Sequence, residues 1–506
     1  MPRPTLLPAV LLLAFTTLAM GAPATAPATT AARRPLNVLL IISDDLRAEL
    51  SSYGGRAKTP NLDALAAAGV RFDRAYCQYP LCNPSRVSML TGRQPVTTGV
   101  FGNRTDFRAQ HPDWVTLPQL FKENGYVSVR AGKIFHGAGL DDPKAWSDDA
   151  GRKNPAPDDE EAQAPPSPAN RAPTTARADR TAPSPAAAPT TARSQMTRAQ
   201  YSDRWIVLEG DGEAHGDYRT ADRTIENLRA HRDRPFFIAC GFVKPHSPPT
   251  APQRFYDQYP LEQIALPPDF APRPTVWEGF PKMSVRPRNA DLFIGREATP
   301  QAAKEMIRAY LASTSWMDFN VGRVLAELDR LGLRDDTVVI FWGDHGYQLG
   351  EKGKWSKAGS VWEQGSRVPL IVAAPKAKGN GQASPRVVES IDILPTLADL
   401  CGLPAPRGIE GRSLAPLLND PQAPSTRPAF TVWSEDGRTL THVAVRTERY
   451  RYAEFDAGRG GAMLLEPQTD PHELKNLADD PAHRAAREEL AGLVKDHVKR
   501  AQAARD

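Results

Sequence analysis

Four short apolar runs, each giving way abruptly to polar residues, constrain the fold of this 506-residue chain more than any other feature. A continuous apolar run of this length is typical of a strand buried on both faces of a sheet. Amphipathic, helix-like stretches lie between the runs, which is the pattern of a parallel sheet covered by helices. We therefore predict an α/β fold with a large, mixed, mostly parallel sheet sandwiched by helices. The runs are NVLLIISDD (37–45), YVSVRAGKIFH (126–136), PFFIACGFVKPH (235–246) and TVVIFWGDHG (337–346), and the helix-like stretches cover 59–72, 116–126, 302–332 and 390–402.

All four runs end in side chains that bind metal ions or transfer protons. Because ligands of open α/β sheets bind beyond the carboxyl ends of the strands, we expect one cleft to collect all four sets. Three carboxylates at one sheet edge are costly unless a cation neutralises them, and oxygen ligands suit a hard divalent ion such as Ca²⁺ or Mg²⁺. The alternative is that these acids cap helices or pair with arginines. The residues in question are Asp44, Asp45, Lys133, His136, Lys244, His246, Asp344 and His345.

Cys82 opens the string CNPSRVSMLTGR (82–93) and is surrounded by polar, Pro-rich and Gly-rich sequence. The chain has only four cysteines, which are too few for a disulfide scaffold at this length. Two of them, Cys240 and Cys401, lie in apolar sequence and are interpreted as small buried hydrophobic residues. The residues around Cys82 leave three readings open: a reactive thiol, a packed thiol, or the precursor of another group.

The run from Cys82 to Arg86, followed by Thr91-Gly92-Arg93, resembles the signature of the sulfatases, C-x-P-S-R with T-G-R a few residues later. Further blocks between about Leu36 and Leu418 resemble the family in the family's order. The pattern is most similar to the iduronate-2-sulfatase branch, because it has an Asp-His pair at 344–345 and a Lys and a His three residues apart in GKIFH. The resemblance implies an alkaline-phosphatase-like fold with a small C-terminal α+β subdomain.

The resemblance also implies a role for each site residue. Cys82 would be converted to formylglycine by a formylglycine-generating or equivalent enzyme. Its hydrate would act as the nucleophile on one bound Ca²⁺. Arg86 would orient this group, Lys133 and Lys357 would hold sulfate oxygens, His136 would take a proton from the hydrate, and His246 would protonate the departing sugar oxygen. The implied metal ligands are Asp44, Asp45, residue 82, Asp344 and His345. Without the resemblance, Arg86 reads as a structural ion pair, the lysines as solvated and His246 as a loop residue.

The two ends of the chain and one internal segment differ in composition from the rest. Residues 1–21 read as a signal peptide cut near Gly21, which predicts a secreted or periplasmic protein, and residues 22–35 read as a disordered linker. We expect a catalytic domain over 36–426, interrupted by a low-complexity insertion over about 154–195. A C-terminal subdomain with a small antiparallel sheet and a terminal helix is expected over 427–506. No later stretch is long and apolar enough to span a bilayer.

The predicted function is a secreted sulfatase, most similar to exo-acting 2-O-sulfatases of uronic acids in glycosaminoglycans or related sulfated polysaccharides. The alternatives are a sulfatase for algal or hexosamine sulfates, a phosphoester or phosphonate hydrolase on the same fold, and a non-catalytic protein that binds sulfated glycans. In the last case Cys82 would stay a thiol, bridged to Cys77 or not. With 63 basic and 59 acidic residues the chain lacks the basic field that nucleic-acid binding needs. Oligomeric state is not readable from the sequence.

Overall fold

The computed structural model describes residues 1, 35–137, 139–147 and 201–503. The expected signal peptide, the linker up to residue 34 and the expected insertion lie outside the described residues. From Pro35 onward, the described residues form one compact unit. In the part of the chain that is described, no helix combines the length and the apolar character needed to cross a membrane.

An eight-stranded sheet forms the centre of this unit. Its strand order is β10-β2-β9-β7-β1-β5-β3, with β8 paired to β2. The four strands predicted from the apolar runs, β7, β1, β5 and β3, are adjacent and parallel, while β9 runs antiparallel to its neighbours. The prediction of a mixed, mostly parallel sheet is confirmed. The strands are β1 (Asn37–Ser43), β2 (Val70–Tyr76), β3 (Val127–Gly132), β5 (Phe236–Phe242), β7 (Thr337–Gly343), β8 (Arg367–Val368), β9 (Leu370–Ala373) and β10 (Ala383–Glu389).

The register brings the ends of the four parallel strands to one level. Ser43, the last residue of β1, lies opposite Phe242 of β5 and Gly343 of β7. Gly132, the last residue of β3, lies opposite Gly241. The residues that follow these strands therefore emerge side by side at one edge of the sheet, as the sequence predicts.

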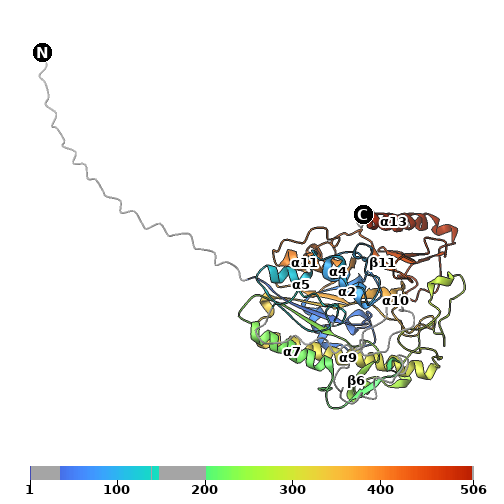
Figure 1. Cartoon of the computed structure of the whole chain (residues 1–506), viewed down its shortest axis with the longest axis horizontal. Helices are drawn as coiled ribbons and strands as arrows, with labels where there is room; N and C mark the ends of the chain where they lie inside the picture. The colour runs from blue at the N-terminus through green and yellow to red at the C-terminus, as the bar shows by residue number, and fades with distance from the viewer. Residues whose placement is uncertain (2–34, 138, 148–200, 504–506) are drawn as a thin grey trace, which may run out of the picture. The chain divides into compact units, whose positions relative to one another are not determined.

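Helices cover both faces of the sheet (Figure 1). Alternate residues of β1 contribute to two separate apolar cores, because successive side chains of a strand point to opposite faces. One core includes residues of α2, α5 and α11, and the other includes residues of α1, α7 and α9. The sandwich arrangement is confirmed. These helices are α1 (Pro60–Ala68), α2 (Cys82–Thr91), α5 (Leu117–Glu123), α7 (Gly216–His231), α9 (Pro300–Arg330) and α11 (Ile393–Leu400).

Helix α2 begins at Cys82 itself and was not predicted from the sequence. All ten of its residues are buried. It ends at Thr91 and is capped by Gly92, whose φ of 66° lies in the left-handed region that favours glycine. Arg86 is one helical turn beyond Cys82 and shares its face of the helix.

The C-terminal part of the chain adds a second, antiparallel sheet in the order β11-β12-β13-β14, followed by helix α13. This confirms the predicted α+β subdomain, while its boundary at residue 427 stays a prediction. The elements are β11 (Ala429–Trp433), β12 (His442–Arg446), β13 (Arg451–Phe455), β14 (Ala462–Leu465) and α13 (Arg484–Ala503). Short elements elsewhere are β4 (Ile206–Leu208), β6 (Thr250–Pro252), α3 (Pro95–Thr98), α4 (Phe107–Gln110), α8 (Gln253–Tyr256), α10 (Glu363–Ser366) and α12 (Ala415–Asn419).

Candidate active site

Cys82 lies among the polar groups that follow β1 and β7. Its Sγ is 3.3 Å from Oδ1 of Asp44 and 3.3 Å from Nε2 of His345. The side chain is fully buried, and none of the four cysteines forms a disulfide, so Cys82 is not bridged to Cys77. The structure thus brings together, from three separate segments, a cysteine and the residues that the sequence predicts as metal ligands.

The donor set around Cys82 fits a divalent cation. Ligand atoms of Asp44, Asp45, Cys82 and His345 all lie within 4.8 Å of one another, and all four residues are buried. The Nδ1 atom of His345 is 3.1 Å from the carbonyl of Gly346, which can only accept a hydrogen bond. Nδ1 therefore carries the proton, and the Nε2 lone pair faces the carboxylates. Carboxylate oxygens with one imidazole form a hard donor set of the kind that suits Ca²⁺.

Asp344 borders this set and also fixes its geometry. Its Oδ1 accepts the backbone amides of Asp45 at 3.1 Å and of His345 at 2.9 Å, and lies 3.6 Å from Nε2 of His345. Asp45 has a φ of 60°, a left-handed conformation that is uncommon outside glycine, and the hydroxyl of Tyr310 donates to its carbonyl at 2.7 Å. These contacts hold a strained residue at the point where the carboxylates meet.

Three buried cations surround the acids. Arg86 donates from Nε to Oδ2 of Asp344 at 2.9 Å, and its Nη1 donates to the carbonyl of Lys133 at 2.6 Å. Nζ of Lys133 is 2.7 Å from Oδ2 of Asp44, and Nζ of Lys357 is 2.9 Å from Oδ1 of Asp45. The solvated-lysine alternative is therefore wrong for both lysines, since each is almost fully buried.

Burial and charge act in opposite directions on the acids. Burial alone would raise the pKa of Asp44, but the positive charges of Lys133 and Arg86 outweigh it and hold the pKa well below its usual value. Burial raises the pKa of Asp45 well above its usual value, because Lys357 offsets it only in part and Asp44 adds a like charge. Burial likewise raises the pKa of Asp344. A cation at the centre favours the ionised form of all three.

His246 and His136 complete the predicted set. His246 is buried, its Nδ1 lies 2.8 Å from the carbonyl of Ser247, and its Nε2 is 4.0 Å from Oδ2 of Asp45. As in His345, the contact with a carbonyl places a proton on Nδ1, and Nε2 faces Asp45. His136 is buried three residues beyond Lys133, at the same end of β3. The proton-transfer roles of both histidines stay predictions.

Two residues near the centre were missed or left open by the sequence. Asp291, which is buried, has its Oδ1 3.7 Å from Nζ of Lys357. It sits in an irregular stretch, RPRNADLF, where no periodicity or motif singles it out. Lys244, which the sequence left between solvent and substrate, is fully buried and donates to the carbonyls of His246 at 3.1 Å and Pro248 at 3.0 Å.

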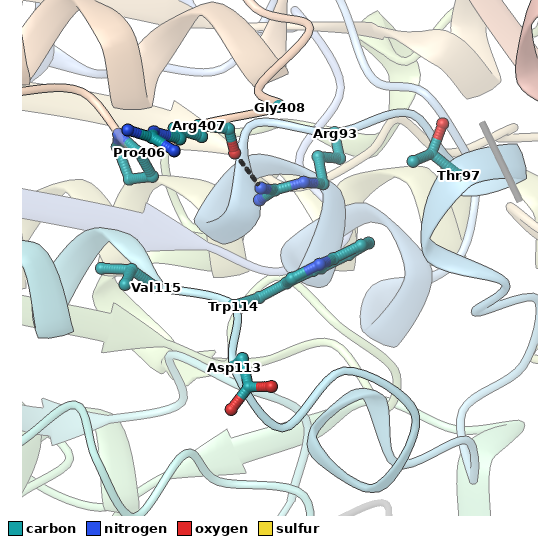
Figure 2. Close-up of a pocket in the computed structure, with 8 residues that line it drawn as sticks. All are labelled: Arg93, Thr97, Asp113, Trp114, Val115, Pro406, Arg407 and Gly408. Atoms are coloured by element: carbon teal, nitrogen blue, oxygen red, sulfur yellow. Dashed lines mark hydrogen bonds between the residues drawn. The ribbon is translucent and has the colours of Figure 1, made fainter.

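A hollow of about 470 Å³ is lined in part by Arg93, which follows the C-terminal end of α2. Figure 2 shows the side chains that line it. There the Arg93 guanidinium lies 4.1 Å from the ring centroid of Trp114 and donates to the carbonyl of Arg407 at 2.6 Å. None of the predicted site residues lines it, so we do not assign the chemistry to this hollow. It is lined by Arg93, Thr97, Asp113, Trp114, Val115, Pro406, Arg407 and Gly408.

The fold and the site together define a class of enzyme. Carboxylates and one imidazole lie at the carboxyl edge of the parallel sheet, and buried basic side chains flank them. Buried lysines and an arginine around a cation site suit the transfer of a tetrahedral anion such as a sulfuryl or phosphoryl group. Comparison with solved structures agrees with this fold. The solved structure of a 2-O GAG sulfatase superposes with a TM-score of 0.65 over 93% of each chain, at 22% sequence identity. That likeness shows the alkaline-phosphatase-like fold that the sequence implies.

Sequence comparisons identify the family within this class. The family model named Sulfatase matches residues 36–403, and a second, for the C-terminal part of N-sulphoglucosamine sulphohydrolase, matches residues 350–500. A sulfatase of Formosa agariphila is 31% identical over 90% of this chain and 86% of its own length. Iduronate 2-sulfatase of Mus musculus is 32% identical over 88% of this chain and 92% of its own. The chain belongs to the sulfatase family and resembles its iduronate-2-sulfatase branch, and this membership supports a sulfuric ester hydrolase.

Proposed function

We propose that this protein hydrolyses sulfate esters of sugars with a formylglycine nucleophile derived from Cys82, and that its preferred substrate is a terminal uronic acid carrying a 2-O-sulfate. The observation that carries the proposal is the position of Cys82, whose Sγ lies 3.3 Å from both Asp44 and His345 at the start of a fully buried helix. A purely packed thiol has no need of two buried ionisable neighbours, whose desolvation is costly.

Each of the residues around position 82 has a separate role in the proposed reaction. Asp44, Asp45, Asp344 and His345 would hold a divalent cation such as Ca²⁺, which would lower the pKa of a hydroxyl group of a formylglycine hydrate at position 82 and so supply an oxygen nucleophile. Arg86 orients this end of α2 by tying it to Asp344 and to the chain after β3.

Lys133 contacts Asp44 and Lys357 contacts Asp45, and from these positions the two ammonium groups can hold sulfate oxygens. In its imidazolium form, His246 delivers the proton on Nε2 to the sugar oxygen as the bond from that oxygen to sulfur breaks and the bond from the nucleophile to sulfur forms. His136 accepts a proton from the hydrate. The two lysines thus bind the sulfate group, and the two histidines transfer the protons of the reaction.

The choice of a uronic acid 2-sulfate rests on the relatives. Iduronate 2-sulfatases of Mus musculus and Homo sapiens are both 32% identical to this chain, and the Asp-His pair and GKIFH spacing match that branch. We further infer export through the signal peptide at residues 1–21 into the periplasm or medium, and conversion of Cys82 by a formylglycine-generating or equivalent enzyme. Sulfate esters of algal polysaccharides or hexosamines are the alternatives.

The test measures sulfate release from two disaccharides, one with a 2-sulfate on a terminal uronic acid and one sulfated only on the hexosamine. Mass spectrometry of the AYCQYPLCNPSR peptide reports whether Cys82 has become the aldehyde. We expect release from the first disaccharide alone, its loss in Cys82→Ala and after chelation of divalent ions, and no loss in Cys401→Ala, a cysteine at the end of α11.

Other outcomes would change the proposal in defined ways. Release from the second disaccharide alone would keep the nucleophile and overturn the substrate. Hydrolysis of phosphonate monoesters in preference to both would point to the related phosphonate chemistry. An unmodified Cys82 with binding of sulfated sugar but no release from any ester would overturn the catalytic assignment altogether.

A further inference from the structure

The segment that carries Asp291 is bound on both sides to the loop that carries Lys357. Asn289 accepts the backbone amide of Trp355 at 3.0 Å, and the amide of Leu292 donates to the carbonyl of Trp355 at 3.3 Å. Nζ of Lys354 donates to the carbonyl of Arg288 at 2.7 Å. These bonds leave little freedom for Asp291 to move relative to Lys357.

Asp291 and Asp45 approach the same ammonium group. Nζ of Lys357 lies 2.9 Å and 3.0 Å from the two oxygens of Asp45 and 3.7 Å from Oδ1 of Asp291. All three side chains are at most 2% exposed, so water screens these charges little. A lysine ammonium is a point charge on a flexible four-carbon stem, so one carboxylate fixes its distance but not its direction. A second carboxylate fixes the direction as well.

We propose that Asp291 is a positioning residue that holds the Lys357 ammonium where it meets the sulfate group. The inference rests on the proposed function, in which Lys357 binds sulfate oxygens. It follows from a difference between the two carboxylates: Asp45 belongs to the compact cation-binding set, whereas Asp291 lies outside it. Asp291 is therefore a carboxylate partner of Lys357 outside the set that the cation would occupy, and together with Asp45 it holds the ammonium group in a fixed direction.

For sulfate binding, the proposal predicts the opposite effect of Asp291→Asn from the one that charge repulsion alone predicts. A negative charge beside a sulfate site repels the anion, so on simple electrostatics the near-isosteric change Asp291→Asn would strengthen sulfate binding. If Asp291 positions Lys357, the same change weakens binding, because the ammonium is no longer held in place. Removing a positioned donor costs about 10²–10³-fold in rate, and a displaced donor costs a fraction of that.

The experiment titrates inorganic sulfate into the full-length protein by calorimetry and measures sulfate release from the 2-sulfated disaccharide. We expect Asp291→Asn to weaken sulfate binding by about 10-fold and to lower kcat/KM by roughly 10- to 100-fold. In a Lys357→Gln background, the same change should alter the sulfate Kd by less than about 2-fold, because the group that it positions is absent. If Asp291→Asn does not fold, Asp291→Ser provides the same comparison.

Asp269→Asn is the matched control, because Asp269 is a buried acid 2.7 Å from Nζ of Lys352, another buried lysine of the same loop. We expect it to lower stability without changing the sulfate Kd. Unchanged or tighter sulfate binding in Asp291→Asn, or an equal effect with and without Lys357, would overturn the inference. A wild-type protein that neither binds sulfate nor releases it from any ester would instead overturn the proposed function.

Discussion

Replacing Lys244 by methionine tests how the structure positions His246. Lys244 is fully buried, and its Nζ donates to the carbonyls of His246 and Pro248. The backbone around it is also held, since its amide donates to Oδ2 of Asp217 at 2.9 Å and its carbonyl accepts from Ser43 at 2.8 Å. Methionine preserves most of the apolar stem and lacks the ammonium group, so the change removes the two bonds to the loop.

The expected loss of stability follows from those two bonds. A hydrogen bond from a charged donor contributes about 1.5–3 kcal/mol, and part of this is offset because methionine has no ammonium group to desolvate. We expect the free energy of unfolding to fall by about 2–4 kcal/mol, measured by chemical denaturation. The loop would then be free to shift, and a displacement of about 1 Å at a reacting group costs on the order of 10²-fold in rate.

Comparing two sulfate esters with different leaving groups distinguishes a specific effect on His246 from a general loss of structure. A sugar oxygen needs a proton as it departs, whereas nitrophenolate is a stable anion that leaves without one. For Lys244→Met we expect kcat/KM to fall roughly 10- to 100-fold on a sugar sulfate and less than about 3-fold on nitrophenyl sulfate. Lys352→Met, which removes another buried lysine, should show no such difference. Equal losses on both esters, or no loss at all, would refute the reasoning.

Two further predictions concern stability. A Cβ on Gly241 would lie 1.9 Å from the carbonyl oxygen of Lys133. Gly241→Ala should therefore destabilise the protein by at least about 1–3 kcal/mol and lower its activity by displacing Lys133. Gly492→Ala is the control, because a Cβ there would meet open space, and it should not destabilise the protein. Burial lowers the pKa of His442 and of His497 to about 4, below the value of about 6.5 in the unfolded chain, so the unfolded state binds more protons between these values. The free energy of unfolding should therefore fall as the pH drops from about 6.5 to 4, by at most about 3 kcal/mol per histidine. In a variant carrying both His442→Gln and His497→Gln, the free energy of unfolding measured by denaturation should depend less on pH.

The sequence predicted the strands and the edge at which the site assembles because both depend on local pattern. Continuous apolar runs specify strands buried on both faces, and parallel strands bring their following residues to a common edge. Asp44, Asp45, Asp344 and His345 directly follow such strands, so their proximity was predictable without any tertiary information. Cys82 was identified by a motif, since nothing in the composition of α2 marks it as a buried helix.

The rest of the site depends on contacts that no local pattern records. Asp291 belongs to an irregular stretch, and it reaches Lys357 only because the 288–292 segment pairs with the chain around Trp355. The left-handed conformation of Asp45 is similarly imposed from outside, by the side chain of Asp344 and the hydroxyl of Tyr310. Residues whose position is set by distant partners lie beyond what a single sequence can predict.

The balance of charge explains why so many ionisable groups are buried together. Asp44, Asp45, Asp344 and Asp291 offer up to four negative charges, against three positive charges on Arg86, Lys133 and Lys357. Burial penalises every one of these charges, and only mutual pairing makes the cluster tolerable. When all seven side chains are ionised they sum to one negative charge, and a bound divalent cation would bring the centre to one positive charge. A sulfate ester carries one negative charge, so substrate binding would bring the centre to neutrality. The site can therefore accept a singly charged sulfate ester among buried side chains, and neutralising any one of the seven side chains would leave an uncompensated charge in the cluster.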